Sequence, residues 1–183
     1  MNIIGKKIYL RAMEPEDMEV LREMINDPVM ERKIEGWSFP VSRKQQMNWY
    51  ENSITSQSNL KFSIVSRSSE QLLGMLNLVD IDWKNGVAQH GIRLSNAAPK
   101  AQGIGTDAVM AIMRYAFEEL RLNKLESGRI IDNIASQRLY AKCGWKDEGI
   151  KREAIFCEGR YLDFVITGIL KKEYYLVKAQ LGY

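Results

Sequence analysis

The sequence predicts a mixed α/β protein built around one largely antiparallel, twisted sheet of about seven strands with about four flanking helices. Short apolar or alternating segments bounded by turn residues are typical of strands. Capping residues precede segments whose apolar residues recur at helical spacing. The chain has 183 residues, of which 45% are hydrophobic and 27% charged. We therefore expect residues 1–183 to fold as a single domain.

The first half of the chain should form a strand, three helices and then three antiparallel strands. Proline suits the first position of a helix, and Ser42 with Gln45 forms a capping box. Asn85-Gly86 is a strong signal for a tight hairpin. In chain order we expect a strand over 8–11, helices opening near Pro15 and Pro28, a helix over 42–54, and strands over 61–67, 71–79 and 87–94.

The second half should alternate helices and strands. A glycine-punctuated loop, Pro99 to Thr106, leads into a segment with apolar residues on one helical face. Asn133 is a typical helix cap, and Gly144 is a typical helix stop. In chain order we expect a helix over 107–120, a strand over 124–131, a helix from 133 to 143, and strands over 150–157 and 161–170.

Charge and cysteine content exclude several classes of protein. The net charge is +3, with −1 in residues 1–90 and +4 in residues 91–183. This net charge is too small to indicate nucleic-acid binding, although the positive charge of residues 91–183 favours an anionic ligand there. Cys143 and Cys157 lack CxxC spacing, and one histidine excludes a multi-histidine zinc site, so we expect no metal. No stretch approaches the ~20 apolar residues of a membrane helix, and the opening residues do not form a secretory signal. We expect a cytoplasmic protein.

The loop before the helix at 107–120 carries the sharpest chemical signal. Gly103 and Gly105 let backbone N–H groups approach a ligand without obstruction by a Cβ atom. The helix that follows adds its own unsatisfied N–H groups and the positive end of its dipole. Such a loop predicts a phosphate cradle, although Gly-x-Gly alone also occurs in ordinary tight turns. It is neither a Walker loop nor a dinucleotide fingerprint, because the further residues of those motifs are missing.

A second motif begins 30 residues after Gly103 and reads Asn-x-Ala-Ser-x-x-x-Tyr-x-x-x-Gly-Trp, from Asn133 to Trp145. The two motifs together resemble the GNAT superfamily of acetyl-CoA-dependent N-acetyltransferases. The family's phosphate motif reads Gln/Arg-x-x-Gly-x-Gly/Ala, and here Lys100 stands at its first position. The opening and ending of the chain look like the branch with ribosomal-protein N-terminal, spermidine and amino-sugar acetyltransferases, so the resemblance covers essentially the whole chain.

The resemblance implies a site for acetyl-CoA as the acetyl donor. The pyrophosphate would sit on the loop, and the pantetheine arm would pair with the preceding strand, whose backbone N–H would face the thioester oxygen. Asn133 and Ser136 would contact the cofactor, and Tyr140 would lie near the sulfur as general acid, although a half-buried packing tyrosine fits the same position. The cofactor-binding residues are then Ile92, Arg93, Leu94, Gln102, Gly103, Ile104, Gly105, Thr106, Asn133 and Ser136.

The general base is left open. Many relatives carry Glu near positions 88–90, where this chain has Gln89 and His90. Strand alternation places these two side chains on opposite faces, so only one can face the cleft. His90 could titrate near neutral pH, or it could be a packing residue. Glu126 is the other candidate, because family members often have Glu on that strand. Glu35, Asp80, Asp82 or a chain of water molecules are further alternatives.

The acceptor is the least determined part of the site. An aromatic loop over 35–40, with Trp49 and Tyr50 on the next helix, could shape an acceptor pocket or belong to the core. It has no dense acidic cluster, which modestly disfavours a polyamine. We expect a small-molecule amine such as an amino sugar, with a protein N-terminus as the alternative.

A non-catalytic acyl-CoA-binding module on the same fold is the competing class, but the retained Tyr140 and both motifs favour an enzyme. The apolar tail over 174–183 could take part in a homodimer or cap the core.

Overall fold

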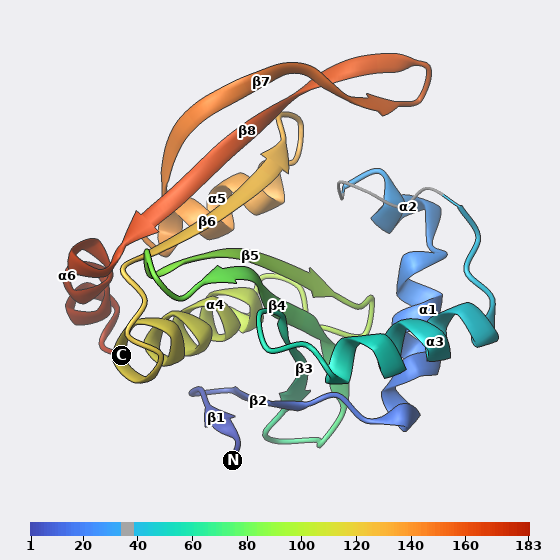
Figure 1. Cartoon of the computed structure of the whole chain (residues 1–183), viewed down its shortest axis with the longest axis horizontal. Helices are drawn as coiled ribbons and strands as arrows, with labels where there is room; N and C mark the ends of the chain where they lie inside the picture. Colours follow the sequence, from blue (N-terminus) through green and yellow to red (C-terminus); the bar gives the residue numbers. More distant parts are fainter. Residues whose placement is uncertain (34–38) are drawn as a thin grey trace.

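The computed structural model describes residues 1–33 and 39–183 (Figure 1). Among these residues, eight strands form one sheet in the order β1-β2-β3-β4-β5-β6-β8-β7. The strands are β1 (Ile3–Ile4), β2 (Ile8–Ala12), β3 (Leu60–Ser66), β4 (Leu72–Asp82), β5 (Val87–Leu94), β6 (Lys124–Ile130), β7 (Lys146–Cys157) and β8 (Arg160–Leu170). All neighbouring strands are antiparallel except β5 and β6, which confirms the predicted fold class.

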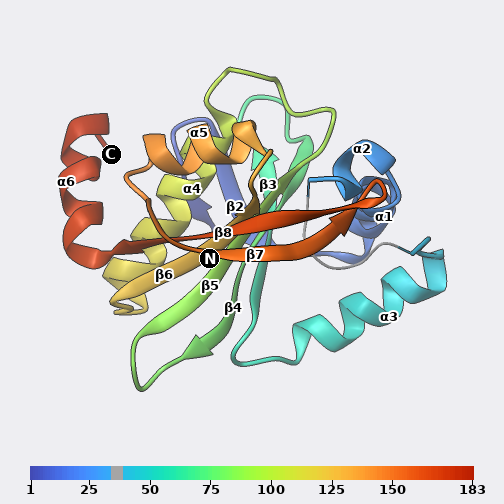
Figure 2. The same cartoon turned by 90° about the horizontal axis from the view of Figure 1, so that it is seen from above.

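Helices cover both faces of the sheet. They are α1 (Met18–Ile25), α2 (Pro28–Glu31), α3 (Arg43–Ile54), α4 (Ile104–Arg114), α5 (Ile134–Lys142) and α6 (Lys171–Leu181), with a 3-10 turn η1 (Pro15–Asp17) and a π-helical turn η2 (Tyr115–Glu119). In Figure 2, α4 and α5 lie on one face, and α1, α2 and α3 lie on the other. The larger apolar cluster lies under α4, and a smaller one lies under α1 and α3. We call the second side the α1–α3 face.

The predicted strands and helices agree closely with the structure, with four differences. The helix predicted from residue 107 begins at Ile104, because Gly103 adopts a left-handed conformation (φ 80°) that turns the chain directly into the helix. Strand β7 starts at residue 146 rather than 150. The two-residue β1 is too short to give a periodic signal. Helix α6 is capped by the non-polar Leu170, which gives no start signal in the sequence.

The C-terminal tail forms helix α6, one side of which packs on the core. Tyr174 and Val177 are buried in the main apolar cluster, so one side of the tail caps the core of its own chain. Tyr175 and Leu176 are 46% and 67% exposed and form its outer side.

A fork between β5 and β6 is the feature of the sheet that positions the site (Figure 1). The two strands pair in parallel only from Val87 opposite Lys124 to Gln89 opposite Glu126. Beyond this point β5 stays with β4, and β6 stays with β8. The facing edges of both strands are therefore left without a strand partner, and their backbone groups are available to a ligand.

The glycine loop before α4 is tied to the start of the sheet by a single side chain. The carboxylate of Asp107, in the first turn of α4, accepts hydrogen bonds from the backbone N–H groups of Lys6, Lys7 and Ile8 at 2.9, 2.6 and 3.0 Å. Asp107 is only 1% exposed. This contact joins segments about 100 residues apart and brings the Lys7 side chain to the loop.

Candidate functional site

The loop before α4 has the geometry of an anion cradle. The backbone N–H groups from Gly103 to Thr106 donate to no protein acceptor in the described part of the chain. A Cβ atom at Gly103 would meet nothing within 4 Å except the Lys7 ammonium at 3.9 Å, so the approach to these groups is open. Gly105 instead packs tightly against Leu139 and Leu94. The first glycine therefore leaves the loop N–H groups open, and the second allows the helix to pack closely.

Lys7 is a functional candidate that the sequence does not indicate. Its ammonium nitrogen donates to the carbonyl oxygen of Gln102 at 2.5 Å, within the loop. An ammonium group beside a row of N–H groups and a helix N-terminus increases the positive potential for a phosphate. No local pattern could reveal this contact, because the two residues lie 95 positions apart.

The apex of the fork brings together Tyr140, Ser127 and His90. Ser127 and His90 are the first residues beyond the last paired positions of β6 and β5. The Ser127 hydroxyl donates to the Tyr140 hydroxyl at 2.9 Å, and the rings of Tyr140 and His90 pack edge to face at 5.9 Å. Burial raises the pKa of Tyr140 to about 12, with the Ser127 hydrogen bond acting in the opposite direction. The phenol is therefore protonated at any physiological pH.

His90 is a neutral, buried imidazole. Burial lowers its pKa to about 4, while a hydrogen bond from Nδ1 to the carbonyl oxygen of Asn77, at 2.9 Å, acts to raise it. The proton therefore sits on Nδ1, and Nε2 is a buried atom without a hydrogen-bond partner among the described residues. A base with a pKa this low takes up protons poorly at neutral pH.

Glu126 lies at the same apex but on the α1–α3 face. Its two carboxylate oxygens accept hydrogen bonds from Gln89 Nε2 and Lys124 Nζ, each at 2.8 Å. The side chain of Glu126 is 29% exposed, so water reaches it. The structure confirms that strand alternation sends Gln89 and His90 to opposite faces: Gln89 contacts Glu126, whereas His90 contacts Tyr140.

Polar contacts span the opening of the fork. Asn133 caps α5 by accepting from the Ser136 N–H at 3.1 Å, and its Nδ2 donates to the Lys33 carbonyl oxygen at 3.1 Å. Arg32, just after α2, forms an ion pair with Glu158 in the β7–β8 turn at 3.0 Å. Figure 1 shows α2 and the β7–β8 hairpin facing one another across this opening. The walls of the fork are thus held by residues from both halves of the chain.

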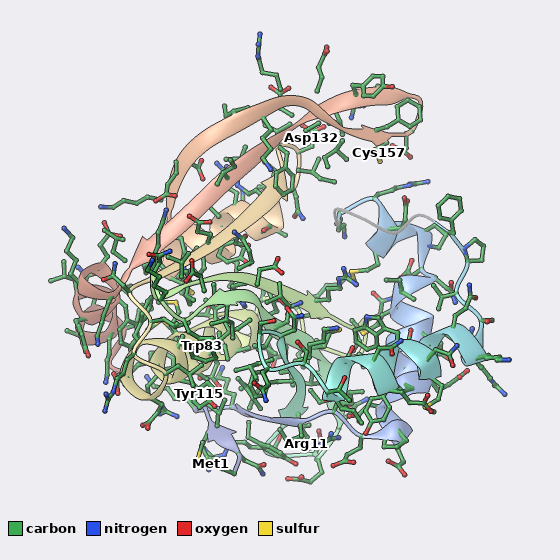
Figure 3. The ribbon with its side chains drawn as sticks, in the orientation of Figure 1. Met1, Arg11, Trp83, Tyr115, Asp132 and Cys157 are labelled. Atoms are coloured by element: carbon green, nitrogen blue, oxygen red, sulfur yellow. The ribbon has the colours of Figure 1, made fainter. Side chains whose placement is uncertain are left out.

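The remaining candidates for the base and for the acceptor pocket lie in different parts of the structure. Glu35 lies outside the described residues. Asp80 and Asp82 lie near the β4–β5 hairpin, away from the opening of the fork. Two labelled residues in Figure 3 mark these places: Trp83 lies at the hairpin, and Asp132 lies beyond the far end of β6. Phe39 is 69% exposed, whereas Trp49 and Tyr50 pack partly buried against the smaller apolar cluster.

No three His, Cys, Asp or Glu side chains gather into a possible metal site within residues 1–33 and 39–183. In the same part of the chain, no helix is both long and apolar enough to span a bilayer.

The residues present fit an acyl-CoA ligand. The open N–H cradle with its lysine suits a diphosphate, and the unpaired edge of β5 suits the amide groups of a pantetheine arm. The predicted residues Ile92, Arg93 and Leu94 lie on this edge strand, while Gln102, Gly103, Ile104, Gly105 and Thr106 form the cradle.

Comparisons with known proteins agree with this geometry. The family model described as Acetyltransferase (GNAT) domain matches residues 7–146. The SPbeta prophage-derived uncharacterized N-acetyltransferase YokL of Bacillus subtilis (strain 168) is 30% identical over 94% of each chain. The spermidine N(1)-acetyltransferase of Vibrio cholerae is 26% identical over 93% of this chain and 97% of its own. The crystal structure of a V. cholerae spermidine N-acetyltransferase with CoA and spermine superposes with a TM-score of 0.84 at 22% identity, covering 93% of this chain and 99% of that one.

The forked sheet, the open glycine loop and these matches lead to one conclusion: the chain belongs to the GNAT acetyltransferase family and is an acetyl-CoA-dependent N-acetyltransferase.

Proposed function

We propose that residues 1–183 form one catalytic domain that moves an acetyl group from acetyl-CoA to a primary amine of a small molecule, by direct attack in a ternary complex. A relative named as a spermidine N(1)-acetyltransferase supports a small amine as acceptor. Strand β8 and helix α6 lie beyond the matched family region, yet they belong to the same sheet and core. This supports a single functional unit.

Acetyl-CoA supplies a thioester, whose carbonyl carbon accepts the amine nitrogen and whose sulfur leaves as a thiolate. The N–H groups from Gly103 to Thr106, with Lys7, would hold its diphosphate. The free edge of β5 would align its pantetheine arm. Asn133 and Ser136 stand at the start of α5, on the other side of the fork, where the N-terminus of a second helix faces the opening.

Tyr140 is the group we assign to the leaving thiolate. Its hydroxyl lies at the apex, against the first residue of β6 beyond the last pair. With a pKa of about 12, complete proton transfer to a thiolate is uphill by about 3 to 4 pKa units. Hydrogen-bond donation to the developing negative charge is therefore the main part of its role. Ser127 and His90 position the phenol from two sides.

Glu126 is the group we assign to the amine proton, through a water molecule. Its carboxylate contacts Gln89 at the apex, on the α1–α3 face, and it is partly exposed. Lys124 forms a direct ion pair with it at 2.8 Å. The neutral His90 lies on the opposite face, so it supports Tyr140 instead of acting as base.

The hydrogen bond between Tyr140 and Ser127 at the apex is the observation that carries this proposal, and Tyr140→Phe tests it. Removing one hydrogen-bond donor to a developing charge should lower kcat about 10- to 1000-fold, with little change in the Kd for acetyl-CoA. Thiol release with a panel of amines measures kcat, and a thermal shift measures acetyl-CoA binding. Tyr174→Phe is the matched control, because it also removes a tyrosine hydroxyl with a hydrogen bond, at 2.8 Å to Glu118, away from the fork.

Two results would contradict the proposal in different ways. Equal turnover in Tyr140→Phe and the native protein would remove Tyr140 from the mechanism. Acetyl-CoA binding with no transfer to any amine or peptide N-terminus would instead indicate a non-catalytic module.

We also propose that the enzyme works in the cytoplasm, because Cys143 and Cys157 are both free thiols. The exposed Tyr175 and Leu176 on α6 offer an apolar strip that a second copy could cover in a homodimer. Sedimentation of the native protein and of Leu176→Glu would test this association.

A further inference from the structure

The α1–α3 face of the fork carries an unusual arginine. Along β5, Gln89, Gly91 and Arg93 share one face, opposite to His90. Arg93 stands across from Met75 in the β4–β5 register, and Met75 packs in the cluster under α1 and α3. Arg93 therefore lies on the same face as Glu126, on the strand that borders the fork.

Arg93 has no acidic partner within residues 1–33 and 39–183. It forms no hydrogen bond or ion pair with any of the described residues, and burial lowers the pKa of its guanidinium. Two carboxylates on the same face are engaged elsewhere: Asp17 accepts two hydrogen bonds from Arg11, and Glu126 is paired with Lys124. A half-buried guanidinium without a counter-ion is unfavourable unless a ligand supplies one.

Lys61 on β3 adds a second positive charge to the same region. Its ammonium donates to the Ser53 hydroxyl at 2.7 Å and lies 4.3 Å from the centre of the Trp49 ring, both neutral partners. Burial lowers the pKa of Lys61, and the charge of Arg93 lowers it further. The two cations thus act on each other, and no described carboxylate compensates either of them.

Strand β4, between the strands of the two cations, carries an unused hydrogen-bond acceptor. Lys61, Asn77 and Gly91 form one row across β3, β4 and β5. The Asn77 amide oxygen is buried without a hydrogen-bond partner and would lie 3.2 Å from a Cβ atom at Gly91. Because Gly91 has no side chain, the Asn77 amide packs directly over the β5 backbone at this position, beside the apex of the fork.

We propose that the acceptor is an amine that also carries an anionic group, a carboxylate or a phosphate, which Arg93 and Lys61 bind. The Asn77 oxygen would accept a hydrogen bond from a donor on the same molecule. This inference rests on the proposed function and narrows its acceptor. It disfavours polyamines, because their additional ammonium groups would meet two uncompensated cations.

Matched acceptor pairs test the proposal. Two pairs vary the carboxylate at two lengths: serine against serinamide, and γ-aminobutyrate against butylamine. A third pair, glucosamine 6-phosphate against glucosamine, varies the phosphate. Spermidine serves as the polyamine. The measured quantity is kcat/KM for thiol release, corrected for the fraction of neutral amine. The native enzyme should prefer the anionic member of at least one pair, and which pair responds identifies carboxylate or phosphate.

Arg93→Met should lower this preference about 10- to 100-fold, as expected for the loss of a hydrogen-bonded charge partner. Arg93→Lys should restore part of it. Arg43→Met is the matched control, because the Arg43 side chain is 81% exposed on α3. Equilibrium binding of the preferred anionic amine in the presence of CoA gives a second readout that needs no turnover.

The outcomes separate the two proposals. A preference that Arg93→Met abolishes and Arg43→Met keeps supports the inference. Turnover without any preference for the anion, a preference for spermidine, or an Arg93→Met change confined to the Kd for acetyl-CoA would overturn it and leave the acetyltransferase function intact. If no amine is turned over, the proposed function fails, and Arg93-dependent binding of an anionic amine still decides the inference.

Discussion

Lowering the pH from 8 to 5 should cost this protein about 2 kcal/mol of its free energy of unfolding through His90 alone. The ordinary histidine pKa of about 6.5 applies to the unfolded chain, while burial lowers the pKa to about 4 in the fold. As the pH falls, the unfolded chain therefore takes up a proton before the folded protein does. The contribution is complete above pH ~6.5 and is lost progressively down to pH ~4, where it totals about 3 kcal/mol.

Because the chain has a single histidine, no other imidazole contributes to the pH dependence of stability in this range. Urea unfolding at pH 8 and pH 5 gives the loss of stability. His90→Gln is the matched variant, because glutamine can still donate to the Asn77 carbonyl oxygen but does not titrate. The pH dependence of its unfolding free energy should be smaller than that of the native protein by about 2 kcal/mol over this range.

An NMR titration of the one imidazole provides an independent check on the folded protein. Its ring resonances should stay at their neutral positions from pH 8 to pH 5. A midpoint near 6.5, or the same pH dependence of stability in His90→Gln and the native protein, would refute the buried neutral imidazole. It would also reopen His90 as a general base.

Three further predictions concern other parts of the structure. Asp17→Asn should destabilise the fold by about 2–4 kcal/mol by leaving Arg11 without its carboxylate partner. Burial acts to raise the pKa of Asp17, but its hydrogen bonds outweigh this effect and lower the pKa. The native protein should therefore lose this contribution to stability below pH ~4, whereas the variant has none to lose. Acid unfolding curves of the two proteins would show the difference. Lys7→Met should weaken acetyl-CoA binding about 3- to 10-fold and reduce its salt dependence in calorimetry; an unchanged Kd would exclude a phosphate contact. Glu126→Gln should lower kcat/KM about 10- to 100-fold without abolishing turnover, since water can still carry the proton; a dead variant with normal acetyl-CoA binding would make Glu126 indispensable.

Much of the fold follows from local signals in the sequence. The capping box at Ser42, the proline starts and the Asn85-Gly86 hairpin act over a few residues, and the structure has the expected elements at those places. Where such signals are weak, the prediction is wrong by a turn or is missing, as at the start of α4 and for α6. Their termini are decided by a left-handed glycine and by packing onto the core.

The sequence by itself determined the strands and helices of the mixed sheet, the glycine loop before α4 and the motif around Tyr140, because each depends on residues that are close in the chain. Only the tertiary structure decided which side chains meet: Lys7 with the loop, Tyr140 with Ser127 and His90, and Glu126 with Gln89. These contacts depend on sheet order, on strand register and on the point where β5 and β6 separate. Since separation in the chain gives no information on distance in the fold, only the packed molecule shows the neutral state of His90 and an Arg93 without a counter-ion among the described residues.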